Sequence, residues 1–402
     1  MTESVAPLSE VHGEVATQFG RVREVFAELS GEIGSGGAAF AAVLDGRVVV
    51  DLWAGSTGAH PWARDTRAVI MSSTKGVATV AVACLVEDGL IDVEAPVATY
   101  WPGFAANGKS EITVATLLSH SAGLVTFPGY EEMLTPYGTG WDRTAEIIAC
   151  LEGAAPTWEP GAASGYHGVT FGWLVGELVR QVSGKTIGRL IAERIVEPLE
   201  IELDLGTPSE RQSLVAPTIL PPEPPPAMAT PDPDLFERMM FTVEGRNLLH
   251  TADQFFAAPG ILGLELGAQN GTATARALAV LYGALANEGS YGADRPLLSP
   301  DVIREFTRER VRGTDRLLGV ERRWGLGFQL ASVPHIATWH AREGWFGHDG
   351  FGGQMAFADP RQRLGLGFVR SHLAWAQSLG PALVDAVYSC LPTREEPESP
   401  IR

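Results

Sequence analysis

Strand-like runs stand near both ends of this 402-residue chain, and helical patterns fill the long stretch between them. Near the N-terminus two apolar runs are joined by Asp45-Gly46, a pair that is typical of a tight hairpin turn. The runs with strand character are residues 38–44, 47–53, 324–330, 354–359 and 364–369. We therefore expect one antiparallel sheet, flanked by helices and built from both chain ends, with a helical region inserted between them.

Apolar residues recur at helical spacing through the middle of the chain and at both flanks. The predicted helices span residues 15–29, 77–87, 113–118, 144–151, 171–182, 187–195, 272–287 and 373–390. This pattern predicts an α/β plus all-α class with two parts: a discontinuous sheet domain of residues 1–75 and 291–402, and a mostly helical domain of residues 76–290. We expect a site in the cleft between the two parts. The proline-rich residues 217–233 predict an exposed connector, with a lid or pocket wall as the alternative.

Charge and composition exclude several functions. Lys and Arg number 30 against 48 Asp and Glu, a net charge of −18, which argues against a nucleic-acid or anionic-membrane partner. The first residues carry no basic run followed by an apolar segment, and no stretch has the length of a membrane span. Three scattered cysteines (Cys84, Cys150 and Cys390) fit reduced thiols of a cytoplasmic protein. We expect no metal site and no cofactor.

The sharpest chemical signal is Ser72-Ser73-Thr74-Lys75, where a strand-like run meets a helix. Residues three apart share one face of a helix, so Ser72 and Lys75 can touch. Lys75 can remove the proton of the Ser72 hydroxyl only when its amine is neutral. Burial and a helix N-terminus favour the neutral amine; lowering its pKa from ~10.4 to ~7–8 costs roughly 3–4 kcal/mol. The alternative is a helix cap with an exposed lysine one turn later.

Two further segments belong with this pair. Tyr166 lies just before a predicted helix, where its phenol can relay a proton to a leaving group. Gly347-His348-Asp349-Gly350 begins a glycine-rich segment before the strand at 354–359, and glycines let a backbone approach a ligand.

Three other residues have competing interpretations. Trp345 can line an acyl pocket or belong to the core. His120 is predicted to cap a helix rather than to act in catalysis. Asn270 is predicted to lie at the N-cap of the helix at 272–287, with lining of the cleft as the alternative.

Taken together, Ser72-x-x-Lys75, Tyr166 and His348-Asp349-Gly350 resemble the three motifs of the penicillin-binding, serine β-lactamase-like superfamily. The phrases around them are most similar to those of the family VIII carboxylesterases, which share the class C β-lactamase fold. The resemblance covers roughly residues 10–390 and is specific to the superfamily rather than to a substrate.

The resemblance implies a role for each of these residues. Ser72 would be the acylated nucleophile, and Lys75 and Tyr166 its general base. The backbone N–H groups of Ser72 and Phe351 would form the oxyanion hole, with donors worth ~3 kcal/mol each. His348, Gly350 and Trp345 would contact the substrate.

Two departures bear on the substrate. Gly168 stands where β-lactamases have the asparagine of their Tyr-x-Asn motif, and His348-Asp349-Gly350 replaces Lys-Thr-Gly. Both changes weaken the grip on a β-lactam and favour neutral esters. No Gly-x-Ser-x-Gly motif is present, which disfavours an α/β-hydrolase.

We therefore expect a cytoplasmic serine carboxylesterase that hydrolyses short-chain or uncharged esters, a small-molecule substrate, through an acyl-enzyme. Three alternatives remain open. An acyltransferase would deliver the acyl group to an alcohol or amine, and a β-lactamase or D-amino-acid amidase would cleave an amide. A sensor, a protein of a different class, would be acylated without turnover.

Overall fold

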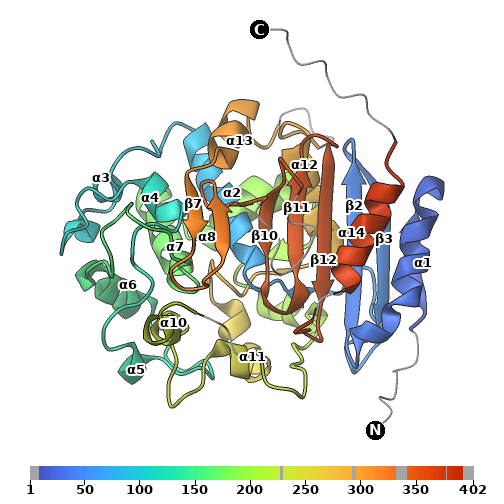
Figure 1. Ribbon diagram of the computed structural model, residues 1–402, viewed down its shortest axis with the longest axis horizontal. Coiled ribbons are helices and arrows are strands. Elements are labelled where there is room, and N and C mark those ends of the chain that lie inside the picture. The colour runs from blue at the N-terminus through green and yellow to red at the C-terminus, as the bar shows by residue number, and fades with distance from the viewer. Residues whose placement is uncertain (1–8, 227–229, 292–295, 332–341, 377, 393–402) are drawn as a thin grey trace.

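A nine-stranded antiparallel sheet forms the centre of the computed structural model, which describes residues 9–226, 230–291, 296–331, 342–376 and 378–392 (Figure 1). In their order across the sheet, the strands are β1 (Val11–Val15), β3 (Arg47–Gly55), β2 (Gly37–Leu44), β12 (Leu364–Arg370), β11 (Met355–Asp359), β10 (Phe346–Asp349), β9 (Gln329–Leu330), β8 (Glu321–Trp324) and β7 (Val311–Thr314). The predicted sheet class and its construction from both chain ends are confirmed.

The two chain ends meet where β2 pairs with β12. The register runs from Leu44 opposite Leu364 to Ala38 opposite Arg370. The hairpin turn at Asp45-Gly46 is as predicted, and both residues have positive φ. One strand differs from expectation, because Val15 ends β1 rather than beginning a helix.

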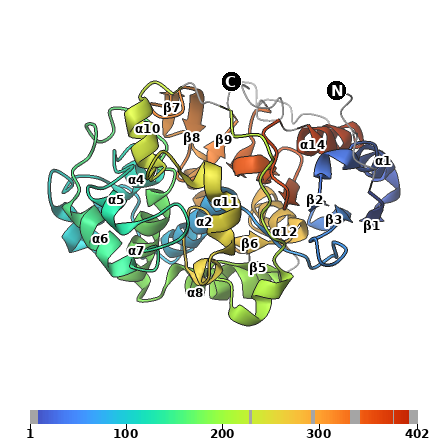
Figure 2. The same cartoon turned by 90° about the horizontal axis from the view of Figure 1, so that it is seen from below.

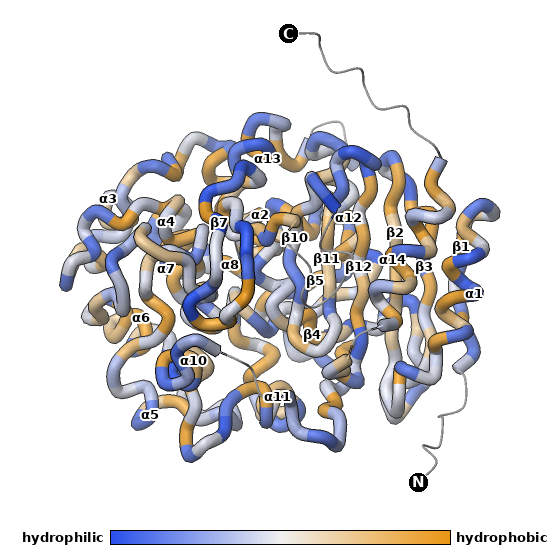
Figure 3. Tube along the Cα trace, viewed as in Figure 1, coloured by the Kyte–Doolittle hydropathy of each residue, from blue (hydrophilic) through white to orange (hydrophobic). Residues whose placement is uncertain are grey.

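Helices cover both faces of the sheet (Figures 1 and 2). On one face α1 (Gly20–Glu28) and α14 (Leu379–Ser389) share an apolar cluster with β2, β3, β11 and β12. On the other face α12 (Ala275–Ala286) packs closely on β12. Glycines make this approach possible, since a Cβ at Gly365 or Gly367 would lie 2.1 or 2.2 Å from the α12 backbone. Figure 3 shows the apolar residues along these central strands.

The helical region lies beside the sheet and is joined to it by α2 (Ser73–Glu87) (Figure 2). Buried residues occupy nearly every position of α2, which is why its sequence is apolar all round. The other helices are α3 (Val97–Tyr100), α4 (Val114–Leu118), α5 (Tyr130–Met133), α6 (Thr144–Gly153), α7 (Thr170–Ser183), α8 (Ile187–Ile191), α9 (Glu197–Leu199), α10 (Pro233–Met239), α11 (Leu248–Ala257) and α13 (Pro300–Thr307).

Two predicted helices are shorter than expected. The helix predicted at 187–195 ends at Ile191 and continues as a π-helical turn, Ala192–Val196. The helix predicted at 373–390 begins only at Leu379. A second, three-stranded sheet joins β4 (Ala68–Val69), β6 (Thr272–Ala273) and β5 (Leu203–Asp204). Among the helices of the described ranges, none has both the length and the apolar character to cross a membrane.

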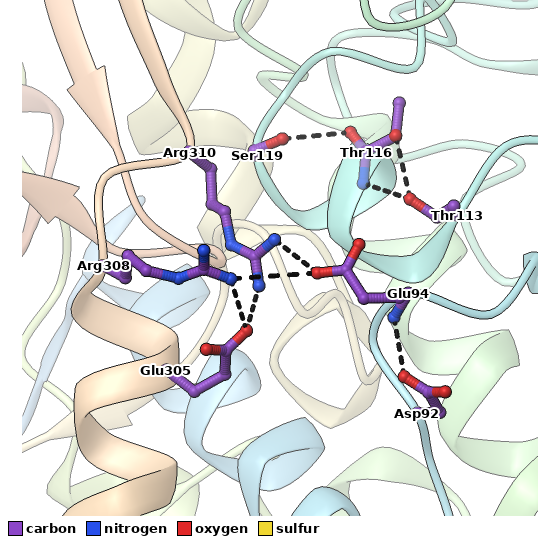
Figure 4. A network of polar contacts seen from close by, with 8 residues as sticks. All are labelled: Asp92, Glu94, Thr113, Thr116, Ser119, Glu305, Arg308 and Arg310. Atoms are coloured by element: carbon purple, nitrogen blue, oxygen red, sulfur yellow. Dashed lines mark hydrogen bonds and ion pairs between the residues drawn. The ribbon is translucent and has the colours of Figure 1, made fainter.

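A network of ion pairs ties the helical region to β7 (Figure 4). The Arg310 guanidinium contacts the Glu94 carboxylate at 2.5 Å and also pairs with Glu305. Glu305 in turn pairs with Arg308 at 3.0 Å. In the same view, Thr113 caps α4 by accepting the N–H of Thr116. The division into residues 1–75 with 291–402 and 76–290 stays a prediction, and α12 of the middle segment packs on the sheet.

Candidate active site

Ser72 and Lys75 lie together at the start of α2. Lys75 Nζ is 3.1 Å from Ser72 Oγ, 2.7 Å from the carbonyl oxygen of Gly168 and 2.9 Å from that of Ala268. A neutral amine has two N–H donors and one lone pair. Two carbonyls therefore satisfy its donors, and the lone pair is left for the Ser72 hydroxyl.

The surroundings of Lys75 favour that neutral form. Its side chain is fully buried, and desolvation holds its pKa well below the ordinary value, with the Asp349 carboxylate acting weakly the other way. The helix N-terminus repels a positive charge as well. The alternative of an exposed lysine is excluded by this burial.

Ser72 directly follows a strained residue. Met71 has φ of 49°, in the left-handed region, between β4 and α2. Non-glycine residues seldom adopt this conformation, and they cluster at functional sites. Ser72 itself is half-buried at the N-cap of α2, with its side chain in the cavity described below.

Tyr166 lies next to this pair. Lys75 Nζ is 4.8 Å from the centre of the Tyr166 ring, and Tyr166 lines the same cavity as Ser72. Burial raises the pKa of Tyr166. The structure thus brings together all three residues that the sequence predicts for catalysis.

Two histidines hold the segment that carries Tyr166. His120, just beyond α4, accepts the N–H of His167 at Nδ1 over 3.1 Å, and its carbonyl accepts the N–H of Gly165. The His167 ring accepts the N–H of Leu124 at Nε2 and faces the Gly165 carbonyl with Nδ1. Desolvation lowers the pKa of His167 to about 4. Both imidazoles are therefore neutral and serve to position the loop.

His348 and Gly350 border the nucleophile from the sheet. The predicted glycine-rich loop is in fact strand β10 at His348, whose carbonyl accepts the Ser73 hydroxyl over 3.0 Å. Burial lowers the pKa of His348 to about 3, so the ring is neutral. A Cβ on Gly350 would lie 2.7 Å from the Ile70 carbonyl oxygen, so only glycine permits this approach.

The two amides predicted for an oxyanion hole face one cavity. Ser72 is the N-cap of α2, and Phe351 begins a 3-10 turn one residue after the end of β10. Both residues line the cavity, and no hydrogen bond among the described residues engages either N–H.

The cavity has a volume of about 290 Å³ and is mainly apolar. Its far wall is formed by residues of α10, α11 and the turn between them, namely Phe236, Met239, Met240, Leu248, Leu249, Ala252 and Phe256. Pro225 and Pro226 complete this wall, so the proline-rich segment is more than the exposed connector expected from the sequence. Residues 227–229 of that segment lie outside the described residues.

Gly168 stands at the position of the asparagine in the β-lactamase motif, and other groups take the place of the missing amide side chain. Its carbonyl supplies an acceptor to Lys75, and a Cβ on Gly168 would lie 2.3 Å from Met239 Sδ. A methionine of α10 thus occupies the space that an amide side chain would need.

Two other predictions are corrected. Trp345 lies outside the cavity, in the cluster beneath α14, where Nε1 donates to Asp359 and Tyr388. Its contacts in that cluster put its side chain on the face of the sheet that α1 and α14 cover. It takes the core role that the sequence left open.

Asn270 is neither an N-cap nor a cavity residue. Thr274 caps α12. Asn270 instead binds the loop before it, donating to Ile261 and Leu264 and accepting from Leu266.

The sequence interpretation missed two polar residues of the cavity. Arg322 on β8 is 6% exposed, and Gln269 is 7% exposed; both line the cavity. Arg322 had a detectable signal, since it stands two residues before Trp324 and so shares its face of a strand.

Comparison with known proteins places these residues in a family. The Beta-lactamase family matches residues 22–381. The Mycobacterium tuberculosis protein named esterase/beta-lactamase LipL is 34% identical over 385 residues, which is 90% of this chain and 83% of LipL.

Solved structures agree with this match. A penicillin-binding protein homologue from Caulobacter crescentus has a TM-score of 0.85 and 34% identity, covering 95% of this chain and 100% of its own. A family VIII carboxylesterase has a TM-score of 0.81 and 34% identity with the same coverage. Since the family match spans most of the sequence and includes Ser72, Lys75, Tyr166 and His348, the protein belongs to the beta-lactamase family.

Proposed function

We propose that the protein is a serine carboxylesterase that cleaves uncharged esters through an acyl-enzyme on Ser72. The observation that carries this proposal is the 3.1 Å contact between Lys75 Nζ and Ser72 Oγ, inside a site where two carbonyls occupy the other amine donors. This arrangement suits a neutral base facing its nucleophile.

Ser72, Lys75, Tyr166 and Phe351 each have a defined role in the proposed mechanism. Lys75 and Tyr166 together take the Ser72 proton while Oγ attacks the ester carbonyl carbon. The resulting oxyanion accepts hydrogen bonds from the N–H groups of Ser72 and Phe351. Tyr166 returns the proton to the departing alkoxide, which leaves as the alcohol. Water then repeats the sequence on the acyl-enzyme and releases the carboxylic acid.

The cavity supports an uncharged acyl group. Its wall on α10 and α11 is apolar and offers no polar partner to a charged group that lies against it. His348, being neutral, offers no permanent cation to a substrate carboxylate. The relatives named esterase/beta-lactamase and family VIII carboxylesterase support ester hydrolysis as the activity.

Hydrolysis of p-nitrophenyl acetate and butyrate tests the proposal. We expect turnover by the wild-type protein and a loss of at least about 10³-fold in the Ser72→Ala variant. A phosphonate ester should add one equivalent of mass to Ser72 alone. A Ser72→Ala variant that keeps its full rate would show that the site is wrong. A product burst without turnover would instead indicate a sensor.

A second activity is supported by the name of LipL, which includes beta-lactamase. The acyl-enzyme chemistry is the same, but the site lacks the lysine of Lys-Thr-Gly. We expect nitrocefin to be hydrolysed far more slowly than p-nitrophenyl butyrate at equal concentration.

A further inference from the structure

The turn between β10 and β11 carries the Phe351 N–H group and contains three glycines. Two of them, Gly352 and Gly353, have φ of 79° and 114°, in the left-handed region. Two hydrogen bonds close the turn, one from the Gly350 N–H to the Gln354 carbonyl over 2.7 Å. The other runs from the Gly353 N–H to the Gly350 carbonyl over 3.2 Å. Because glycines leave a backbone conformationally free, the position of the Phe351 amide depends on what packs against the turn from outside.

The part of the chain shortly after β12 supplies this packing. The Ala374 N–H donates to the Gly352 carbonyl over 3.0 Å. The Leu373 side chain fills the space beside Gly352, where an added Cβ would lie 2.6 Å from Leu373 Cβ. The Trp375 ring lies against the Phe351 ring, with 5.2 Å between centres and 40° between planes. This part of the chain therefore holds the turn at Phe351 and at the residue that follows it.

The proline-rich segment before α10 supports Trp375 and its neighbours in turn. The Ile219 N–H donates to the Ser371 carbonyl over 2.8 Å, and the Ile219 carbonyl accepts the Leu373 N–H over 2.9 Å. Further along the segment, the Glu223 carbonyl accepts the Trp375 Nε1–H over 2.8 Å. Prolines restrict the backbone, so this segment can act as a stiff support without belonging to a sheet.

We propose that Trp375, anchored by the carbonyl of Glu223, positions the Phe351 N–H group for the oxyanion. Trp375 acts in this role through Phe351 and is a positioning residue. The proline-rich segment thereby contributes to catalysis from outside the reacting atoms. The inference rests on the proposed function, in which the Phe351 N–H stabilises the oxyanion.

Loss of this support should weaken binding of the transition state and leave binding of the ester unchanged. Removal of one oxyanion donor costs about 10²–10³-fold in kcat, and a displaced donor should cost less. In Trp375→Ala we expect kcat for p-nitrophenyl acetate and butyrate to fall about 10- to 100-fold, equally for both, with KM within about twofold. Trp375→Phe keeps a ring against Phe351 but loses the bond to Glu223, so its kcat should fall about 3- to 10-fold.

Glu223→Ala is the matched control. It removes an exposed side chain and keeps the carbonyl that accepts the Trp375 Nε1–H. Its kcat and KM should equal those of the wild type. Trp375→Leu, which keeps an apolar side chain at the position, serves if Trp375→Ala fails to fold, and the same loss of kcat is expected.

A transition-state analogue separates positioning of the oxyanion donor from a general loss of structure. Ser72 Oγ can add to the carbonyl carbon of 1,1,1-trifluoro-2-hexanone. The carbonyl π pair then moves to its oxygen, and the Ser72 proton passes to the base formed by Lys75 and Tyr166. The hemiketal oxygen needs the same two N–H donors as the oxyanion. The Ki of this ketone should therefore rise in the Trp375 variants by the factor by which kcat/KM falls.

Three results would overturn the proposal. One is a Trp375→Ala variant with the kcat and the Ki of the wild type. Another is a loss that appears in KM and grows with the acyl chain, since Trp375 would then be a wall for the substrate. A Trp375→Phe variant with wild-type kcat would overturn the part assigned to the Glu223 carbonyl. Failure of the proposed function is a separate result, because it would show as a Ser72→Ala variant that keeps its rate.

Discussion

At the scale of single residues, the proposed function depends on one amine whose burial favours the uncharged form. Lys75 is buried completely, and its nitrogen meets two carbonyls and one hydroxyl. Arginine in its place would stay charged at any accessible pH and cannot accept a proton.

Lys75→Arg should therefore lower kcat/KM for p-nitrophenyl butyrate by about 10²–10⁴-fold, the usual contribution of a general base. Lys185→Arg is the control, because Lys185 is exposed and pairs with Glu193 on the surface. Steady-state kinetics of the two variants test this directly. Equal rates in both would show that Lys75 is not the base.

Gly350 should be just as sensitive for a steric reason. A methyl group there would lie 2.7 Å from Ile70 O and 3.1 Å from Met71 Cβ, and would push β10 away from the nucleophile. We expect Gly350→Ala to lower kcat at least about tenfold with little change in the stability of the helical region.

Gly153→Ala is the matched control for Gly350→Ala. A Cβ at Gly153, at the end of α6, meets nothing within 4 Å. The kcat of Gly153→Ala should equal that of the wild type. If the two glycine variants behave alike in kinetics and thermal melting, the close approach at Gly350 is not needed for activity.

The contact between Ser72 and Lys75 could be predicted because the two residues form a local pattern, whereas the rest of the site does not. Ser72 and Lys75 are one helical turn apart, so their contact follows from spacing alone. Arg322 reaches the cavity only through the pairing of β8 with its neighbours. The core position of Trp345 depends on which face of the sheet it takes, and a residue just before a strand does not settle that.

At the scale of elements, we propose that α10 and α11 select the acyl group. They carry the apolar wall of the cavity that Ser72 also lines. Neither helix could be predicted from the sequence, since both are short and follow a proline-rich stretch in which periodicity is weak. Strand β1 could not be predicted for a similar reason, since its five residues show little pattern, and its last residue, Val15, was expected to begin a helix.

A larger residue in this wall should shorten the acceptable acyl chain. Leu249 is half-buried on α11 and lines the cavity. Leu249→Trp should reduce kcat/KM for p-nitrophenyl octanoate about tenfold or more while that for the acetate stays within about twofold. The ratio of the two rates is the measurement, and Leu214→Trp, at an exposed position, is the control. Equal losses on both esters would contradict a role for this wall in acyl selection.

At the scale of the whole molecule, three buried imidazoles make stability depend on pH. Burial lowers the pKa of His348 to about 3 and that of His167 to about 4, and it lowers that of His120 as well. The unfolded chain binds protons on these rings below pH ~6.5, and the folded chain does not. Stability is therefore present above that pH and falls as the pH drops towards the folded values.

Each neutral imidazole should cost about 1.4 kcal/mol per pH unit in this window, so three should cost about 3–4 kcal/mol between pH 6 and pH 5. Urea unfolding at pH 7.5, 6 and 5 measures this slope. His60 is exposed, so His60→Gln should leave the slope unchanged. A slope of less than one proton would contradict neutral burial of the three rings.

The general architecture was predictable because strands at both ends and helices between them leave few arrangements. Which helix packs on which face of the sheet could not be predicted from the sequence. The packing of α12 on β12 depends on Gly365 and Gly367. In the sequence these two glycines appear only as interruptions of an apolar run.

The pairing of β2 with β12 has a consequence for synthesis. During translation the β2–β3 hairpin emerges early and must wait for nearly the whole chain before its long neighbour appears. Until then the β2 edge of this apolar hairpin has no neighbouring strand. It can pair with another exposed strand, for example one from a second nascent chain. The nine-stranded sheet can be completed only after residues 364–370 have been synthesised.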